Sequence, residues 1–377
     1  MRRLYILFAL SFFMSFAAYA EEPALQTAAK QAYVIDFDTG AVLYEKDADA
    51  RMPTASMSKV MTMYLVFDAL KAGRLKLEDE LLVSQRAWET QGSKMWVPIN
   101  EKVKVEDLIR GVIIQSGNDA TIVLAEALAG SEDAFALAMT KRAKEIGMEN
   151  SNFKNASGWP DPEHYSTPHD LGIMAQRLIK DFPEYYPYYS EKEFTYHDIK
   201  QGNRNPLLYR NIGVDGVKTG HTEEAGYGLI ASAMQDGRRI VAVLSGMKDQ
   251  QERADESARI VQWALGSFTN ISLFKTPKEI ERIPVVFGEG ESVGVAVAEP
   301  LMVTVPKMDR ESATVEISYQ SPLIAPVKEG QNVGKATVKI PGVKDIVVPL
   351  VTVGAVEEAG LFGKIMQKAK MMLGGKA

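Results

Sequence analysis

A change of sequence pattern near Asn270 constrains the fold of this chain of 377 residues more than any other feature. The residues before this point and the residues after it require different architectures. Before this point, apolar residues recur at helical spacing, and short β-rich runs lie at both ends of the region. After it, short β-rich runs are separated by turns containing glycine or proline, and no helical stretch interrupts them. We therefore expect an α/β (α+β) domain over residues 21–270 and a small all-β domain over residues 271–356. The expected β-rich runs of the second region are 284–287, 293–298, 301–305, 314–319, 337–340 and 346–350.

Two hairpins are predicted in the first region, one near each end. Residues 32–44 form one around the turn at 38–40, and residues 227–244 form the other around an Asp-Gly pair, a strong two-residue turn signal. Because strands lie at both ends of a helical middle, we expect a sheet built from strands that are distant in sequence. Helices are predicted over residues 58–70, 105–115, 119–129, 134–146 and 253–265.

The first twenty residues have the pattern of a secretory signal peptide. Arg2 and Arg3 form a basic start, residues 4–18 carry no charge, and the small-x-small pattern Ala-Tyr-Ala ends at Ala20. An uncleaved anchor is the alternative, but the apolar stretch is shorter than the ~20 residues that a spanning helix needs. We expect cleavage after Ala20 and export, which would change the net charge from −6 to −8 by removing the two arginines.

Residues 357–377 predict a C-terminal amphipathic helix. Lysines and a glutamine occupy one side of it, and it is too short to span a bilayer but long enough to lie along its surface. A helix that packs on the protein's own core is the alternative; the terminal position and the lysines favour a membrane anchor. The apolar stripe comprises Leu361, Phe362, Ile365, Met366, Ala369, Met372 and Leu373.

Composition excludes several classes of site. The chain has no cysteine, so it has no disulfide, no thiolate metal site and no thiol nucleophile. Its four histidines leave little room for imidazole-based metal sites, and the acidic net charge of −6 argues against nucleic acid as a partner. We expect neither metal nor cofactor. His164 and His169, in a proline-rich loop, and His197 are expected to be structural, because no His-Glu-x-x-His pattern is present.

Ser56 and Lys59 form the first of three short motifs that carry chemistry. Ser-x-x-Lys alone is weak evidence because it occurs at three other places, but only this copy opens a long apolar-periodic helix shortly after a proline. Residues three apart lie on the same helical face, so the amine and the hydroxyl are within reach of each other. An amine in this position can take the proton of the hydroxyl, and a helix N-terminus favours the negative charge that develops.

The other two motifs are Ser-Gly-Asn at residues 116–118 and Lys-Thr-Gly at residues 218–220, each found once in the chain. The first follows an apolar stretch, which suits a loop between helices, although such a tripeptide alone is a plain turn. The second precedes the later hairpin, where an edge strand could offer a cation, a hydroxyl and a close approach to its backbone. Asp119, after the first of these motifs, is expected to make local hydrogen bonds rather than to act as a second acid.

Together the three motifs resemble those of the active-serine penicillin-recognising enzymes, which include β-lactamases and penicillin-binding proteins. The chain is similar in particular to the low-molecular-weight D-alanyl-D-alanine carboxypeptidases of the penicillin-binding protein 5 type (peptidase family S11). The matching segments are residues 116–120, 156–167 and 215–222, and the likeness continues through the β-rich region and the amphipathic tail. It implies a penicillin-binding/β-lactamase-like transpeptidase domain, a small all-β domain and a C-terminal amphipathic helix.

The resemblance also implies a substrate and a mechanism. The substrate would be a peptidoglycan stem peptide ending in D-Ala-D-Ala, and β-lactam antibiotics would be covalent inhibitors. Ser56 would form an acyl-enzyme, Lys59 would be the general base and Ser116 would relay a proton to the leaving amine. The base requires a lowered pKa, for which burial and a nearby cation such as Lys218 would be responsible. The enzyme would act on the periplasmic face of the cytoplasmic membrane, attached peripherally through its tail.

The remaining site residues implied by the resemblance bind the substrate. Asn118 would hydrogen-bond its amide side, and Thr219 and Arg253 would hold its terminal carboxylate, a task suited to a guanidinium. The backbone N–H groups of Ser56 and His221 would form the oxyanion hole. Lys218 and Gly220 would complete the substrate-binding set, with a charge and a close backbone approach.

Three alternatives remain at this point. A class A β-lactamase reads Ser-Asp-Asn where this chain has Ser-Gly-Asn, and residues 157–164 do not resemble its loop with the deacylating glutamate. A D,D-endopeptidase of the same superfamily generally lacks the second domain and the tail. A non-catalytic peptidoglycan-binding scaffold would keep the fold, but every residue that the chemistry needs is present here.

Overall fold

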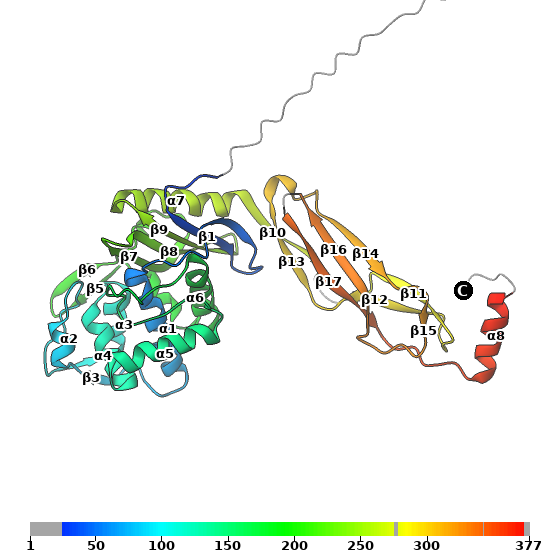
Figure 1. Cartoon of the computed structure of the whole chain (residues 1–377), viewed down its shortest axis with the longest axis horizontal. Coiled ribbons are helices and arrows are strands. Elements are labelled where there is room, and N and C mark those ends of the chain that lie inside the picture. The colour runs from blue at the N-terminus through cyan, green and yellow to red at the C-terminus, as the bar shows by residue number, and fades with distance from the viewer. Residues whose placement is uncertain (1–24, 275–277, 342, 373–377) are drawn as a thin grey trace, which may run out of the picture.

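The computed structural model describes residues 25–274, 278–341 and 343–372, so the predicted signal peptide lies outside the described residues. The molecule is elongated, with the helix-containing domain at one end, the β-domain next to it and the C-terminal helix α8 (Leu361–Met372) at the other end (Figure 1). This is the order of parts that the sequence predicts: an α/β penicillin-binding-type domain, an all-β domain and a terminal helix.

The first domain is built on one antiparallel sheet of five strands, in the order β2-β1-β9-β8-β7. Strand β1 from the start of the chain pairs with β9 from the end of the domain, which confirms a sheet of strands distant in sequence. Asp236 and Gly237 both have positive φ between β8 and β9, as the predicted two-residue turn requires. The strands are β1 (Gln31–Asp36), β2 (Val42–Lys46), β7 (Val214–Thr222), β8 (Gly226–Gln235) and β9 (Arg238–Met247).

Helices cover both faces of this sheet. Alternate residues of β1 point to opposite sides: Tyr33 and Ile35 belong to the large core with α1 and its neighbouring helices, whereas Ala32 and Val34 pack with α7. Two helices, α2 and α6, were not predicted, and the second corrects the expectation for His169, which lies in the first turn of α6 rather than in a loop. The helices are α1 (Lys59–Lys71), α2 (Gln85–Glu89), α3 (Val105–Ile113), α4 (Asn118–Ala129), α5 (Glu132–Glu145), α6 (Pro168–Asp181) and α7 (Gln250–Ser267).

Short elements connect these helices and strands. They include the two-stranded pairs β3 (Glu80–Leu82) with β4 (Lys102–Lys104) and β5 (Glu193–Tyr196) with β6 (Ile199–Gly202). The 3₁₀ turns η1 (Ala55–Ser58), η2 (Tyr186–Ser190) and η3 (Pro206–Tyr209) complete the domain. Of these, η1 matters most for function because it leads directly into α1.

The β-domain contains a six-stranded sheet in the order β14-β16-β17-β12-β11-β15 and a separate pair, β10 with β13. All six predicted runs are strands, but β10 begins at Phe268, and a short 3₁₀ turn, η4 (Lys307–Asp309), lies in a region expected to contain no helical stretch. The strands are β10 (Phe268–Phe274), β11 (Glu281–Val286), β12 (Ser292–Val297), β13 (Leu301–Pro306), β14 (Thr314–Tyr319), β15 (Leu323–Ile324), β16 (Asn332–Ile340) and β17 (Val343–Val353).

A hydrogen-bonded cluster joins the two domains. The carboxylate of Asp36, which is fully buried, accepts from Arg238 Nε at 2.8 Å and from Asn270 Nδ2 at 3.1 Å. Asn270 Oδ1 in turn accepts from the hydroxyl of Thr304 at 2.9 Å, and the hydroxyls of Thr304 and Thr39 are 2.6 Å apart. The end of β1 is thereby connected to β10 and β13 of the β-domain.

Helix α8 touches the β-domain through its polar side. Gln367 accepts from the Phe287 N–H at 2.5 Å and donates to the Gly288 carbonyl at 3.0 Å, and Lys364 forms an ion pair with Glu358. None of the described residues of the helix is buried. The apolar residues Leu361, Phe362, Ile365, Met366 and Met372 are all exposed.

Candidate active site

The first motif lies at the start of α1, as its spacing predicts. Ser56 is in the 3₁₀ turn η1 and is half-buried, while Lys59, the first residue of α1, is only 1% exposed. Lys59 Nζ lies 2.8 Å from Ser56 Oγ. A residue with positive φ, Ala55, precedes the serine, so the backbone turns sharply just before the hydroxyl.

The other partners of Lys59 determine what its amine can do. Its Nζ lies 2.8 Å from Asn118 Oδ1 and 2.6 Å from the Ser157 carbonyl oxygen, and both of these atoms can only accept. A neutral amine has two N–H donors and one lone pair. With both donors used by the amide and the carbonyl, the lone pair remains for the O–H of Ser56.

The protonation state of Lys59 fits this arrangement. Burial, and after it the positive charge of Arg204, lower its pKa to about 7, against the opposing effect of the charges of Asp119 and Glu132. A large fraction of this lysine is therefore neutral near pH 7. The sequence pointed to Lys218 as the nearby cation; the charges of Lys218 and Lys59 do interact, and Arg204 is a further cation that lowers the pKa of Lys59.

The second motif brings Asn118 to this pair at the N-terminus of α4. Its side-chain Nδ2 donates to the Gln91 carbonyl at 2.7 Å, which turns the amide oxygen towards Lys59. Ser116 has positive φ and is 1% exposed, and its hydroxyl has no hydrogen-bond partner among the described residues. A buried hydroxyl without a partner is rare and is available to a bound molecule.

Asp119 makes local hydrogen bonds, as expected. Its buried carboxylate accepts from the backbone N–H groups of Met95, Trp96 and Val97 at 3.0, 2.8 and 3.2 Å. These contacts fix the loop that follows α2 against the start of α4. The residue therefore supports the second motif through hydrogen bonds to the backbone.

The third motif lies on β7, which is an edge strand as predicted. Lys218 is 3% exposed and donates to the Thr219 carbonyl at 3.1 Å. Burial, and then the charges of Lys59, Arg204 and Arg253, hold its pKa well below the usual range. A Cβ on Gly220 would lie 2.9 Å from the Thr54 carbonyl oxygen, so the absence of a side chain lets β7 pack against η1.

Arg253 and His221 lie around one aromatic ring. Arg253, near the start of α7, is 7% exposed; its guanidinium lies 5.6 Å from the Tyr227 ring, and its Nε has no partner among the described residues. The imidazole of His221 stacks on the ring of Tyr227, with the ring centroids 3.8 Å apart, and His221 is exposed. Neither side chain is among the hydrogen-bond partners of Ser56 or Lys59 in the described part of the chain.

Arg204 is a functional candidate that the sequence analysis missed. It donates to Ser93 Oγ at 2.5 Å, and its charge lowers the pKa of Lys59, Lys218 and Arg253. The tertiary fold brings these four cationic side chains close enough for their charges to affect one another. No sequence signal could have found Arg204, because it lies between two asparagines and belongs to no motif.

His164 contacts the turn η1 at Ser58, two residues after the proposed nucleophile Ser56. Its Nε2 is 2.8 Å from Ser58 Oγ, and its Nδ1 accepts from the Lys154 N–H at 3.2 Å, so the hydrogen is on Nε2. Burial lowers its pKa to about 4, which keeps the ring neutral. Ser58 Oγ also lies 2.5 Å from the hydroxyl of Thr54. The histidine thus supports η1, which agrees with the structural role expected for it.

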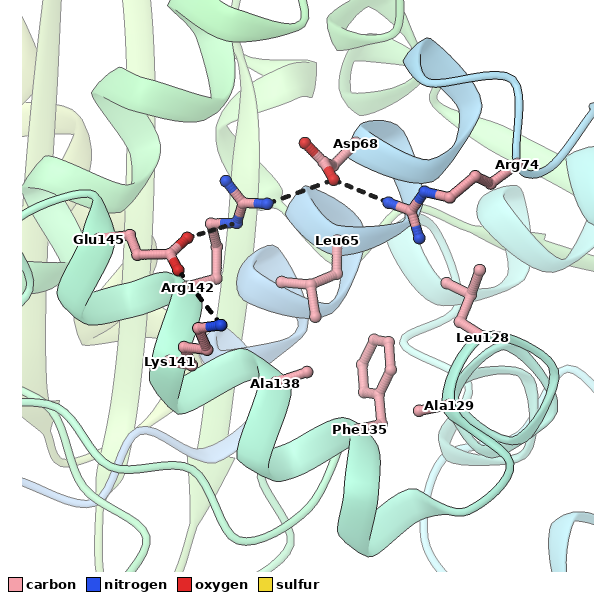
Figure 2. Close-up of a pocket in the computed structure, with 10 residues that line it drawn as sticks. All are labelled: Leu65, Asp68, Arg74, Leu128, Ala129, Phe135, Ala138, Lys141, Arg142 and Glu145. Atoms are coloured by element: carbon pink, nitrogen blue, oxygen red, sulfur yellow. Dashed lines mark hydrogen bonds and ion pairs between the residues drawn. The ribbon is translucent and has the colours of Figure 1, made fainter.

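Other features of the first domain do not compete with this site. In the parts of the chain that the structure describes, no three histidine, aspartate or glutamate side chains gather as metal ligands. A hollow of about 220 Å³ between α1, α4 and α5 is rimmed by charges that pair with one another (Figure 2). There, Asp68 accepts from Arg74 at 2.9 Å and from Arg142 at 3.4 Å, which leaves no free reactive group.

Comparisons with known proteins agree on one family. The D-alanyl-D-alanine carboxypeptidase family (peptidase S11) matches residues 17–249, and the C-terminal domain of penicillin-binding protein 5 matches residues 268–358. The D-alanyl-D-alanine carboxypeptidase DacA of Haemophilus influenzae is 39% identical over 344 residues, which cover 89% of this chain and 87% of that protein.

Two solved structures extend the comparison. Penicillin-binding protein 5 from Haemophilus influenzae superposes with a TM-score of 0.81 at 36% identity, over 90% of this chain and all of that one. Penicillin-binding protein D2 from Listeria monocytogenes, in its ampicillin-bound form, has a TM-score of 0.59 at 30% identity and covers 65% of this chain and 99% of that one. In the described part of this chain, no helix is long and apolar enough to cross a membrane.

Proposed function

The chain belongs to the S11 family of D-alanyl-D-alanine carboxypeptidases, and we propose that Ser56 is the nucleophile with which it cleaves the terminal D-alanine from peptidoglycan stem peptides. The enzyme is a serine hydrolase. The observation that carries the assignment of its nucleophile is the hydrogen-bond geometry of Lys59, whose two other partners can only accept.

Acylation begins with a proton transfer from Ser56 to Lys59. As the proton moves to Nζ, Oγ attacks the carbonyl carbon of the penultimate D-alanine. The backbone N–H groups of Ser56 and His221 hold the negative oxygen of the tetrahedral intermediate. The C–N bond then breaks as the proton on Lys59 passes through the hydroxyl of Ser116, which has no partner among the described residues, to the leaving amine of D-alanine, and Lys59 becomes neutral again. We place Lys218 near this relay.

Deacylation repeats these steps with water as the nucleophile. Lys59, neutral again, accepts a proton from a water that attacks the ester of Ser56. The ester bond breaks, the proton returns to Ser56 Oγ, and the shortened stem peptide leaves as a free acid. The same base serves both steps, which is consistent with a pKa of about 7.

Recognition of the substrate's carboxylate is the task that we assign to the cationic side chains around β7. Arg253 is buried with an unpartnered Nε, and Thr219 lies on the edge strand that faces the nucleophile turn. Lys218 and Arg204 add positive charge, which favours an anionic peptide terminus. Asn118 bonds the amide side of the stem peptide, and Gly220 permits the close approach of its backbone.

Membrane attachment is the second part of the proposal. The polar side of α8 contacts the β-domain through Gln367 and Lys364, and its apolar stripe is exposed, which supports a surface anchor over a helix docked on the core. With residues 1–20 as a signal peptide, 21–270 as the catalytic domain and 271–356 as a spacer, the enzyme would act at the periplasmic face of the membrane.

Deletion of residues 357–377 should release the protein into the soluble fraction with unchanged activity on a small peptide. Loss of activity with unchanged fractionation would contradict the anchor.

Intact-protein mass after incubation with ampicillin tests the nucleophile. We expect a stable adduct on the peptide containing Ser56, absent in Ser56→Ala and retained in Ser312→Ala, a variant of an exposed serine in the β-domain. An unmodified mass in the wild-type protein would contradict the proposal. Rapid hydrolysis of ampicillin without a lasting adduct would favour a β-lactamase instead.

A further inference from the structure

Three of the four tryptophans of the chain are exposed and lie beside the active site. Trp88, Trp96 and Trp159 are 46, 58 and 48% exposed. Trp88 and Trp96 line a hollow of about 410 Å³, and Trp159 lines a neighbouring one of about 780 Å³. Both hollows are lined by Glu89 and Gln91 and are therefore adjacent, and we call the two together the tryptophan groove.

The tryptophan groove borders the catalytic cluster through residues that they share. Ser157 lines the larger hollow, and its carbonyl accepts from Lys59. The carbonyl of Gln91, which lines both hollows, accepts from the side chain of Asn118. The ring of Trp159 packs on Gly92, where a Cβ would lie 3.0 Å from its Cζ3. A molecule that enters the active site from this side therefore passes along the groove.

The tryptophans are held in place by buried polar groups. Trp96 has a φ of +70°, a strained conformation for a bulky residue, and it persists because Asp119 binds its N–H and those of its two neighbours. The backbone of Trp159 is bonded on both sides by Asn155, which accepts from its N–H and donates to its carbonyl, each at 2.9 Å. Such strain, held by its surroundings, is typical of ligand sites.

The chemistry of the groove is mixed. An exposed indole offers a flat apolar face with partial negative charge, which suits a ring that presents C–H bonds on one side. Gln85 and Gln91 donate their amide N–H groups to the side chain and the carbonyl of Glu89. The remaining amide and carboxylate oxygens of Gln85, Gln91, Glu89 and Asp161, which line the two hollows, can accept from hydroxyl and acetamido N–H groups. A wholly apolar ligand would leave these oxygens without partners. Arg86 and Lys94 line the hollows beside the carboxylates, so the groove carries charges of both signs and favours a neutral polar ligand over a polyanion.

We propose that the tryptophan groove binds amino-sugar units of the glycan chain to which the stem peptide is attached. This inference rests on the proposed function, because the peptide in the active site and the sugars are parts of one polymer. Helix α2, which carries Trp88, lies at the end of the molecule opposite α8 (Figure 1). With α8 on the membrane, the groove faces the cell wall. Sugar binding raises the local concentration of the attached peptide at Ser56.

Steady-state release of D-alanine from two substrates tests the proposal. One is an N-acetylated pentapeptide ending in D-Ala-D-Ala, and the other is the same pentapeptide joined to its amino-sugar disaccharide. In Trp88→Ala and Trp96→Ala, we expect KM for the disaccharide-pentapeptide to rise about 3- to 10-fold, as an aromatic contact of ~1 kcal/mol implies. The KM for the free pentapeptide and both kcat values should remain within twofold.

Control variants separate sugar binding from a structural effect. Tyr319→Ala, which removes an exposed aromatic ring of the β-domain, should behave as wild type on both substrates, and Trp88→Phe should recover most of the lost affinity. Equal losses on both substrates would overturn the proposal in favour of a peptide subsite or a structural role. Unchanged KM for both substrates would overturn it outright.

Direct binding distinguishes failure of this inference from failure of the proposed function. Titration of the Ser56→Ala protein with the peptide-free disaccharide should change the tryptophan fluorescence, and less so in Trp96→Phe. Such binding supports the groove even if the wild-type enzyme released no D-alanine. An unaltered spectrum at millimolar disaccharide would contradict the sugar site whatever the activity.

Discussion

The two domains of this protein differ in where they bury polar groups. The first domain buries Lys59, Lys218 and Arg253 almost completely, and buried side-chain atoms without partners occur in it at Ser116 and Arg253, among others. In the described part of the β-domain, the buried polar side chains are Thr304 and Thr352, and both are hydrogen-bonded. Its cores otherwise consist of aliphatic residues.

This difference has an energetic meaning. A buried ammonium or unpaired hydroxyl costs stability, so it persists only where the rest of the domain provides enough apolar burial to offset it. The large core around α1 does so in the first domain. In the described part of the β-domain, no buried side-chain nitrogen or oxygen atom lacks a hydrogen-bond partner. Substitutions in the two domains should therefore have effects of different kinds.

The largest effect is expected for Lys59→Met, which keeps the volume of the side chain but removes the base. The rate of acylation by ampicillin, followed by intact mass, should fall about 10²- to 10⁴-fold. The fold should be retained, because the substitution removes a buried group whose charged form is disfavoured. A rate within fivefold of the wild type would show that another group takes the proton of Ser56.

Gly158→Ala should disrupt the turn that packs against the nucleophile. Gly158 has a φ of +77°, and a Cβ there would lie 1.8 Å from the Ala55 carbonyl oxygen, so the backbone must move. We expect a loss of about 4 kcal/mol of unfolding free energy from overpacking and backbone strain together. Chemical denaturation measures this loss, and a decrease below 1 kcal/mol would contradict the packing described here.

Acid should destabilise the first domain through His164. Its pKa is lowered from 6.5 to about 4 in the folded protein, so the unfolded chain binds more protons between these values. Stability is fully present above pH 6.5 and is lost as the pH falls towards 4, by about 3 kcal/mol. In His164→Gln this pH-dependent loss should disappear from denaturation curves measured at pH 7 and pH 4. An unaltered pH dependence would show that the ring is not buried and neutral.

The smallest effect is expected in the β-domain, at a glycine that matches Gly158 in conformation. Gly330 has a φ of +72°, but a Cβ there would meet nothing within 4 Å. Gly330→Ala should cost about 1 kcal/mol from the left-handed backbone alone and leave the rate of acylation unchanged. A cost as large as that of Gly158→Ala would remove the contrast between the two domains.

The fold was predictable where the local pattern decides the structure. Asp236-Gly237 specifies a turn by its own backbone preferences, and the three-residue spacing of Ser56 and Lys59 places both on one helical face. Helix α6 was not predicted, because the prolines around its start favour a loop. Its start signals were nevertheless present in the sequence, since Thr167 caps the helix and Pro168 is its first residue.

The site was predictable only in part. The three motifs indicate the reactive groups, but the sequence does not show which cation lies near Lys59, since Arg204 arrives there through tertiary folding. The tryptophan groove was not visible for the same reason: whether an indole is buried or exposed depends on elements that are distant in sequence. The apolar stripe of α8 was predictable from the helical spacing of its residues, whereas the hydrogen bond of Gln367 to the β-domain was not predictable from the sequence.

The account depends most on a neutral Lys59 beside Ser56, and the pH dependence of acylation tests it directly. The second-order rate constant for adduct formation with ampicillin, measured by intact mass from pH 5 to pH 9, should rise through an apparent pKa near 7 and then level off. The rise should be absent from the residual rate of Lys59→Met. A rate that is constant from pH 5 to pH 9, or that rises identically in the variant, would contradict the role of Lys59 as the base.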